Sequence, residues 1–211
     1  MNGPADSAKH REPRRKTQQE RSEATKKKLL RAAIKVLENK GYSKFTTSEV
    51  ARVAKSSRGA QTHHFPSTQA FILAAIDHLY ETLLKRTEQR VAAAMQSDEL
   101  LQPVLADASD FLLGPEFLSI YNTLIEIGNG GAKEEVNEIG RRYRLPIEAK
   151  WSHYLIGKGV APLVAENAVW TIFSTVRGLS IRRIFMDDPE HVQRTLDFVM
   201  EMVDERIRAS M

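Results

Sequence analysis

Apolar residues recur along most of the chain with the spacing of α-helices, and no stretch alternates like a half-buried strand. The first predicted helix runs from about Glu23 to Asn39 and ends before Gly41. A longer one runs from Thr68 to about Met95, after the capping residue Ser67. Each carries one apolar stripe, so each should pack that face against a core.

The second half of the chain keeps this spacing, interrupted by glycine and proline. It predicts helices at about 98–113, 115–128, 132–156, 162–186 and 189–208. Pro115, Pro162 and Pro189 stand in the first turn of three of them, where the missing N–H is not needed, and Asp188 can cap the last. The pattern therefore predicts an all-α protein.

Two short helices joined by a tight turn are predicted between Thr46 and Phe65. Thr46 can cap the first helix, and Glu49, three residues later, can return a hydrogen bond to it. The polar run Lys55-Ser56-Ser57 ends that helix, and Ser57 can cap the next one.

The second of these helices, Arg58 to His64, has almost no apolar side chains. Gly59 and Ala60 allow a backbone to come close, and the other residues offer hydrogen-bonding groups. Such a helix suits the major groove of duplex DNA, where base edges differ in their donor and acceptor pattern. The alternative is a solvent-exposed polar helix, which any all-helical protein can carry.

Charge is distributed unevenly around the net +4. Residues 1–65 hold 16 lysines and arginines against 6 acidic residues, and the remainder holds 15 against 21. The positive charge thus falls on the segment that contains the polar helix, as phosphate binding requires. Residues 1–22 are predicted to be a disordered basic tail, which can add phosphate or minor-groove contacts.

Signatures of enzyme chemistry are absent from the sequence. It has no cysteine, no Gly-rich phosphate loop and no HExxH or GxSxG motif, so no catalytic residue, cofactor or metal site is predicted. His63 and His64 are adjacent and would point about 100° apart on a helix, unlike an i, i+4 metal-binding pair. No apolar run approaches the roughly 20 residues that cross a bilayer. With no signal-peptide core either, the chain is expected in the cytoplasm.

Four groups of residues carry a family resemblance. They are Leu29-Leu30-x-x-Ala33-Ile34-x-x-Leu37, Gly41-Tyr42-x-x-Phe45-Thr46-Thr47-x-x-Val50-Ala51, Ser57-Arg58-Gly59-Ala60 and His64-Phe65-Pro66-Ser67. This pattern resembles the amino-terminal DNA-binding domain of TetR-type (TetR/AcrR) bacterial transcriptional regulators. The resemblance implies a three-helix domain with a helix-turn-helix at residues 23–67, after the tail, and a helical regulatory and dimerisation domain at 68–211.

Base or phosphate contacts are expected from the capping threonines and the polar helix. The predicted DNA-binding residues are Thr46, Thr47, Ser57, Arg58, Gly59, Ala60, Gln61, Thr62, His63 and His64.

Five positions depart from the family pattern. Lys55 replaces a turn glycine, which costs about 1 kcal/mol if the positive φ is kept. Ser56 replaces valine and Gln61 replaces leucine. Thr62 and Thr68 replace the tyrosine and lysine that contact phosphates in the family, and a hydroxyl cannot neutralise a phosphate.

Aromatic residues spread over several helices of the second domain, together with a few polar groups, are typical of an apolar ligand pocket, although plain core packing gives the same pattern. The predicted pocket residues are Phe111, Phe117, Tyr121, Asn122, Glu126, Trp151, Tyr154, Trp170, Phe173 and Arg177. A small apolar or aromatic effector would fit such a pocket. The resemblance also implies a homodimer that forms through the last two helices.

These observations favour a DNA-binding transcriptional regulator, a ligand-responsive repressor that binds a palindromic operator as a homodimer. Two alternatives stay open: a constitutive DNA-binding protein without an effector, and a helical small-molecule-binding protein that only resembles a regulator.

Overall fold

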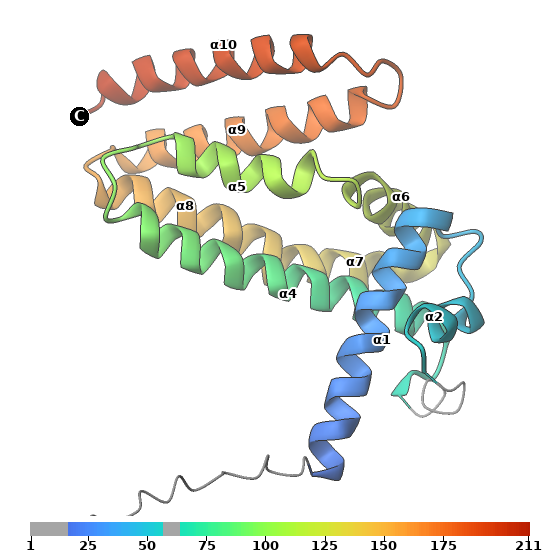
Figure 1. Cartoon of the computed structure of the whole chain (residues 1–211). Helices are drawn as coiled ribbons and strands as arrows, with labels where there is room; N and C mark the ends of the chain where they lie inside the picture. Colours follow the sequence, from blue (N-terminus) through green and yellow to red (C-terminus); the bar gives the residue numbers. More distant parts are fainter. Residues whose placement is uncertain (1–16, 57–63) are drawn as a thin grey trace, which may run out of the picture.

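The computed structural model describes residues 17–56 and 64–211, and within these ranges all regular structure is helical (Figure 1). The predicted all-α fold is confirmed. The elements are α1 (Gln18–Lys40), α2 (Thr47–Val53), α4 (Thr68–Ala94), α5 (Gln102–Leu112), α6 (Phe117–Ile127), η1 (Gly128–Ala132), α7 (Lys133–Ile139), η2 (Gly140–Arg144), α8 (Leu145–Gly157), α9 (Pro162–Arg182) and α10 (Pro189–Arg208), where η1 and η2 are π-helical turns.

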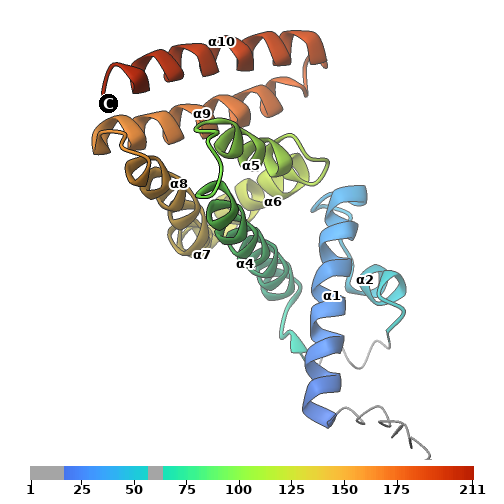
Figure 2. The same cartoon turned by 60° about the vertical axis from the view of Figure 1, so that its left-hand side comes forward.

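The amino-terminal head comprises α1, α2 and the first half of α4. It lies at one end of the molecule, and α9 and α10 lie at the other (Figures 1 and 2). Its core is built on Leu29, Leu37, Val50 and Phe71, all fully or almost fully buried. The ring of Phe65 stacks on that of Phe71 with 4.1 Å between centroids, which anchors the chain just before α4.

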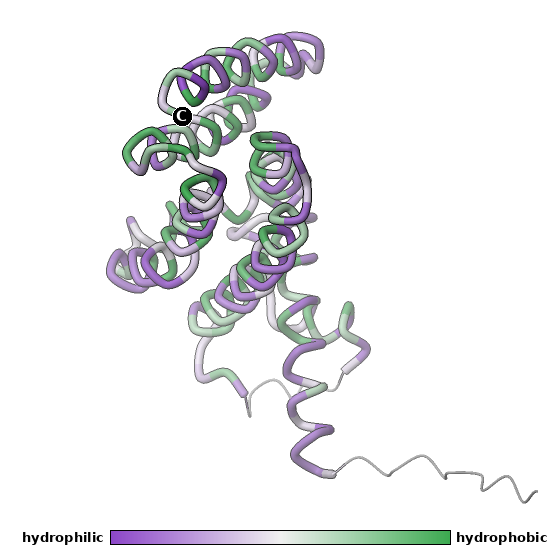
Figure 3. Tube along the Cα trace, turned by 90° about the vertical axis from the view of Figure 1, so that its left-hand side faces the viewer, coloured by the Kyte–Doolittle hydropathy of each residue, from purple (hydrophilic) through white to green (hydrophobic). Residues whose placement is uncertain are grey.

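Helix α1 begins five residues earlier than predicted, so residues 18–22 belong to the helix and not to the tail. A capping box starts it: the Glu20 N–H donates to Thr17 Oγ1 (3.2 Å), and the Glu20 carboxylate accepts from the Thr17 N–H (2.7 Å). Apolar spacing could not reveal this turn, because the first part of α1 is hydrophilic (Figure 3). The buried stripe starts only at Leu29.

The turn after α2 keeps the positive φ of the glycine that the family pattern has at this position. Lys55 has φ 47°, and the N–H groups of Lys55 and Ser56 donate to the carbonyls of Arg52 (3.1 Å) and Ala51 (3.0 Å). This pair of bonds is a Schellman motif, which normally places glycine where Lys55 stands.

The bundle comprises the second half of α4 with α5, α8, α9 and α10, and has a separate core. Asp107 on α5 lies inside it with 4% of its surface exposed. Its carboxylate accepts from Thr87 Oγ1 (2.6 Å), Trp151 Nε1 (2.8 Å) and Arg90 Nη1 (2.9 Å). One buried acid thus joins α4, α5 and α8.

Residues 117–144, from α6 to η2, form the wall between the head and the bundle. The predicted helix at 132–156 is divided here, because η2 interrupts the α-helical pattern at Gly140. Gly131, with φ 105°, bends the chain at the other end of α7. Most buried apolar residues of the wall belong to the core of the head: Ile120, Ile127, Ala132, Ile139 and Tyr143.

We predict that replacing Lys55 by glycine raises the free energy of unfolding by up to about 1 kcal/mol, because glycine adopts a positive φ without a steric cost. Lys55→Ala is the control: it removes the same charge but keeps the Cβ atom. Urea denaturation compares them, and a glycine variant no more stable than the alanine variant would contradict this account.

Replacing Asp107 by alanine should lower the free energy of unfolding by about 3 kcal/mol, because Thr87 and Trp151 lose a buried acceptor and Arg90 loses a counter-charge. Asp110→Ala is the matched control. The Asp110 carboxylate also binds Arg90 but is 49% exposed, so its loss should cost less than about 1 kcal/mol. Equal losses of unfolding free energy for Asp107→Ala and Asp110→Ala in urea denaturation would contradict the role given to the buried hydrogen bonds.

Candidate nucleic-acid interface and ligand cavity

The start of α2 is capped as predicted, but Glu49 does not return the bond. The Glu49 N–H donates to Thr46 Oγ1 (3.3 Å). The Glu49 carboxylate instead accepts from Arg52 (2.7 and 3.0 Å) and pairs with Lys40 at the end of α1 (2.8 Å). Hydrogen bonds from Arg52 and then Lys40 lower the pKa of Glu49 to about 2. The ionised carboxylate therefore links α1 to α2 beside the turn.

The structure describes three of the ten predicted DNA-binding residues. Thr46 is exposed and Thr47 partly exposed at the start of α2, and His64 is partly exposed just before the buried Phe65. The other seven lie outside the described residues: Ser57, Arg58, Gly59, Ala60, Gln61, Thr62 and His63. The head therefore holds both ends of the predicted recognition segment.

Exposed lysine and arginine side chains occur on α1 and on either side of the start of α2. Lys27 and Lys28 are exposed on α1, and Lys44 and Arg52 are exposed on either side of Thr46. Lys44 and Arg52 are not among the predicted DNA-binding residues, although their closeness to the capping threonine is a usable signal. Positive charge at the three lysines favours phosphate oxygens, whereas the charge of Arg52 is already paired with Glu49.

A cavity of about 670 Å³ lies between the bundle and the wall. Edge-to-face and stacked rings line one side of it, with centroids 5.6 Å apart for Tyr80–Phe111, Phe111–Phe117 and Phe117–Tyr121. Its volume and largely apolar lining are those of a small-molecule site.

Five of the ten predicted pocket residues line this cavity: Phe111, Phe117, Tyr121, Phe173 and Arg177. The other five do not. Trp151 and Tyr154 are packed in the bundle core, where each side chain donates a hydrogen bond, to Asp107 and to the Glu99 carbonyl.

Three of the predicted pocket residues face solvent because of their place on the helix. Trp170 is 55% exposed, since the buried face of α9 runs through Val169, Ile172 and Phe173. Asn122 and Glu126 are one helical turn apart on the exposed side of α6. Periodicity alone did not show which polar residues of α6 turn inward.

The polar groups of the cavity include a buried carboxylate held by two arginines. Glu148 Oε1 accepts from Arg144 Nε (3.2 Å) and Arg177 Nη2 (3.4 Å). Burial, and then the neighbouring Arg144, lower the pKa of Arg177. These groups can orient the polar part of a ligand within an apolar site.

Several lining residues escaped the sequence analysis, among them Tyr80, Arg86, Asp107, Arg144 and Glu148. Two of them lie on α4, for which the sequence pattern predicted only an apolar stripe packed against a core. Polar residues close to its apolar stripe, such as Arg86 near Leu83, were the available signal.

Neither a membrane-spanning helix nor a metal site occurs in the described part of the chain. No helix there is long and apolar enough to cross a bilayer. No group of three histidine or acidic residues in residues 17–56 and 64–211 is arranged to hold a metal ion.

Comparisons with known proteins agree with this architecture. Residues 29–75 match the family model of bacterial regulatory proteins of the tetR family. The HTH-type transcriptional regulator CymR of Pseudomonas putida is 35% identical over 195 residues, which cover 92% of this chain and 96% of that protein.

Solved structures share the fold at low sequence identity. A TetR-family regulator from Mesorhizobium loti has a TM-score of 0.72 at 14% identity, covering 87% of this chain and 96% of that one. The multidrug-binding protein EbrR complexed with ethidium has a TM-score of 0.56 at 18% identity, covering 83% and 98%. With the helix-turn-helix signature and the similarity along almost the whole length of CymR, the chain belongs to the TetR family of DNA-binding transcriptional regulators.

Proposed function

We propose that this regulator is a repressor that binds a palindromic operator as a homodimer and releases it when a small apolar or aromatic molecule occupies the cavity. The observation that carries the proposal is the position of α4. Tyr80 and Leu83 of this helix line the cavity, and its first turns, with Phe71 and Ile72, belong to the core of the head.

Operator reading is assigned to the segment from Ser57 to His64, supported by the threonines at the start of α2. In a twofold dimer, two such segments enter major grooves whose centres are about 34 to 36 Å apart, or a multiple of that. Arg58 and Gln61 are the candidates for base contacts. A bacterial regulator meets its operator in the cytoplasm, so the protein is assigned to that compartment.

Dimerisation is assigned to the outer faces of α9 and α10. Four large apolar side chains on these helices are more than half exposed: Leu163, Trp170, Phe198 and Met202. Their spacings of seven residues on α9 and four on α10 put each pair on one face. Exposed apolar faces of this kind mark association surfaces.

The apolar residues on the opposite face of α9 and α10 pack within the subunit. Val169, Ile172, Phe173, Val176 and Leu179 are buried, and so are Leu196, Val203 and Ile207. These residues hold α9 and α10 to the bundle, so the interface is assigned to the opposite side.

Ligand response is assigned to a movement of α4 about its carboxy-terminal end. Lys158 Nζ donates to the carbonyls of Met95 (3.2 Å) and Ser97 (2.7 Å), and the Tyr154 hydroxyl donates to the Glu99 carbonyl (2.6 Å). These bonds fix the far end of α4, while its other end carries the head. Release then needs a ligand that prefers the DNA-free shape by about 1 to 3 kcal/mol.

An effector-free role fits the molecule less well. A constitutive DNA-binding protein has no need of a cavity of about 670 Å³ beside the helix that carries its head. EbrR, which shares the fold, is a multidrug-binding protein that was crystallised with ethidium. A flat aromatic molecule is therefore the first class of effector to test.

Selection of bound sequences from a random duplex pool tests the DNA-binding part of the proposal. We expect a twofold-symmetric consensus whose half-sites are about one helical turn, or a multiple of it, apart. Affinity for that duplex should fall steeply as salt increases, because lysines and arginines displace counterions from phosphates. A pool that yields no consensus, or an asymmetric one, would contradict the proposal.

The dimer interface can be tested with the double variant Trp170→Asp, Phe198→Asp. Two buried, unpaired carboxylates should oppose association, so sedimentation should show monomers at concentrations where the native chain is dimeric. Ile125→Asp on α6 is the control, because Ile125 is 43% exposed but lies outside α9 and α10. An unchanged dimer in the double variant would place the interface elsewhere.

A further inference from the structure

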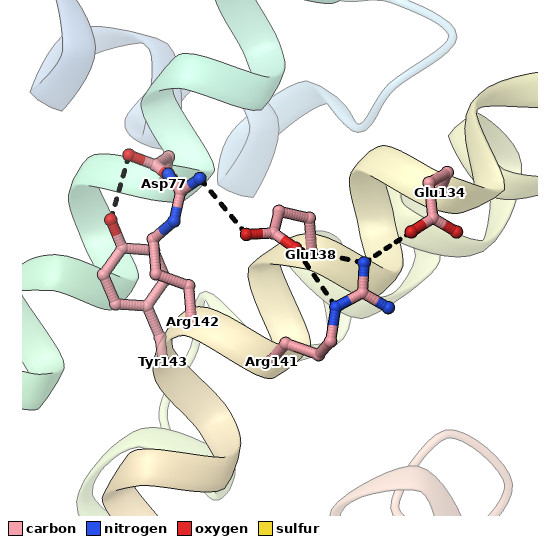
Figure 4. A network of polar contacts seen from close by, with 6 residues as sticks. All are labelled: Asp77, Glu134, Glu138, Arg141, Arg142 and Tyr143. Atoms are coloured by element: carbon pink, nitrogen blue, oxygen red, sulfur yellow. Dashed lines mark hydrogen bonds and ion pairs between the residues drawn. The ribbon is translucent and has the colours of Figure 1, made fainter.

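A polar contact joins α4 to the wall at the boundary of the head. The Asp77 carboxylate accepts from Arg142 Nη1 (3.1 Å) and from the Tyr143 hydroxyl (3.1 Å), one on each oxygen (Figure 4). Arg142 also reaches Glu138 (3.4 Å), one turn back on α7. We call the contact of Asp77 with Arg142 and Tyr143 the latch.

The element that carries the latch, η2, also touches the cavity. Gly140, Arg141 and Arg144 line the cavity, and Tyr143, two positions from Arg141, is buried in the core of the head. A π-helical turn inserts one residue into the helical ladder, and such turns are frequent at functional sites. One five-residue turn therefore contacts the ligand cavity on one side and the head on the other.

A charged groove lies beside the latch, between the head and the wall. It measures about 640 Å³ and lies between α1, α4 and α7. Lys26 and Lys27 line its α1 side, and Glu134 and Glu135 line its α7 side. Within the described residues, neither lysine has an acidic partner within 4.0 Å, whereas Glu134 binds Arg141 (Figure 4). Opposite charges across an open groove favour its closure.

The latch can open at low cost. Arg142 is 53% exposed and Asp77 is 36% exposed, and ion pairs with this exposure contribute little to stability. Tyr143 is different, since its ring is buried and burial raises the pKa of its hydroxyl, which stays protonated and donates to Asp77. The contact is thus directional but weak, as a switch between two arrangements requires.

We propose that the latch is the contact through which the wall of the cavity sets the orientation of the head. A molecule that displaces η2 moves Arg142 and Tyr143, and Asp77 transmits the displacement to α4 directly after Ile76, a buried core residue of the head. The inference rests on the proposed ligand response but concerns a contact present without ligand or DNA.

The test measures the orientation of the head relative to the bundle. The chain has no cysteine, so Lys44→Cys on the head and His153→Cys on α8 supply two specific sites for spin labels, and both positions are exposed. Pulsed electron–electron double resonance then gives the distribution of distances between the two labels. Dilution with an excess of unlabelled protein restricts the measured distances to one subunit.

Asp77→Asn and Arg142→Ala should each widen or shift this distribution relative to the doubly labelled parent, and Arg142→Lys should change it less. Glu81→Gln is the matched control. Glu81 lies one turn further along α4 and pairs with Lys85 of the same helix, so its loss should leave the distribution unchanged.

A distribution unaffected by both Asp77→Asn and Arg142→Ala would overturn the latch, and so would an equal change in Glu81→Gln. If Asp77→Asn fails to fold, Tyr143→Phe decides in its place, because it removes only the hydroxyl. Failure of the chain to select a DNA consensus would refute the proposed function but not the latch, because the distances are measured without DNA.

Discussion

The head of this protein cannot complete its core alone, and this constraint organises the rest of the structure. Helices α1, α2 and the start of α4 leave apolar faces that are closed by Ile120, Ile127, Ile139 and Tyr143 of the wall. Burying side chains of this size stabilises a fold by about 1.5 to 3 kcal/mol each. The head and the wall therefore share one core and are not independent domains.

The cavity lies on the other side of the same wall. Its bundle side is held by more tertiary hydrogen bonds than its wall side. On the bundle side, Asp107 joins α4, α5 and α8 through buried hydrogen bonds, and Lys158 fixes the end of α4. On the wall side, two π-helical turns and Gly131 interrupt the helices. In the proposed response, a ligand that enters between the two sides displaces the interrupted one, which also carries part of the core of the head.

Much of the fold could be predicted from the sequence, because its signals are local. Ser67 and Asp188 cap the helices that they were expected to cap, and Lys55 adopts the positive φ of the glycine that it replaces. The wall could not be predicted in the same way. A π-helical turn at Gly140 leaves the apolar spacing almost unchanged, so 132–156 reads as one helix.

The candidate site was predictable only in part, because a pocket depends on which way each helix faces. Phe173 and Trp170 lie three residues apart on α9, yet one lines the cavity and the other faces solvent. The acidic residues of the cavity, Asp107 and Glu148, were not predicted for another reason. Glu148 reads as a surface residue until Arg144 and Arg177 are placed beside it.

The central claim is that occupation of the cavity and binding of DNA are energetically coupled. The most direct measurement is the affinity of a fluorescent aromatic probe, N-phenyl-1-naphthylamine, for the protein alone and for its complex with the selected duplex. Coupling of the usual size predicts that the free protein binds the probe about 5 to 150 times more tightly than the complex does. Equal affinities for a probe that binds in the cavity would contradict the account.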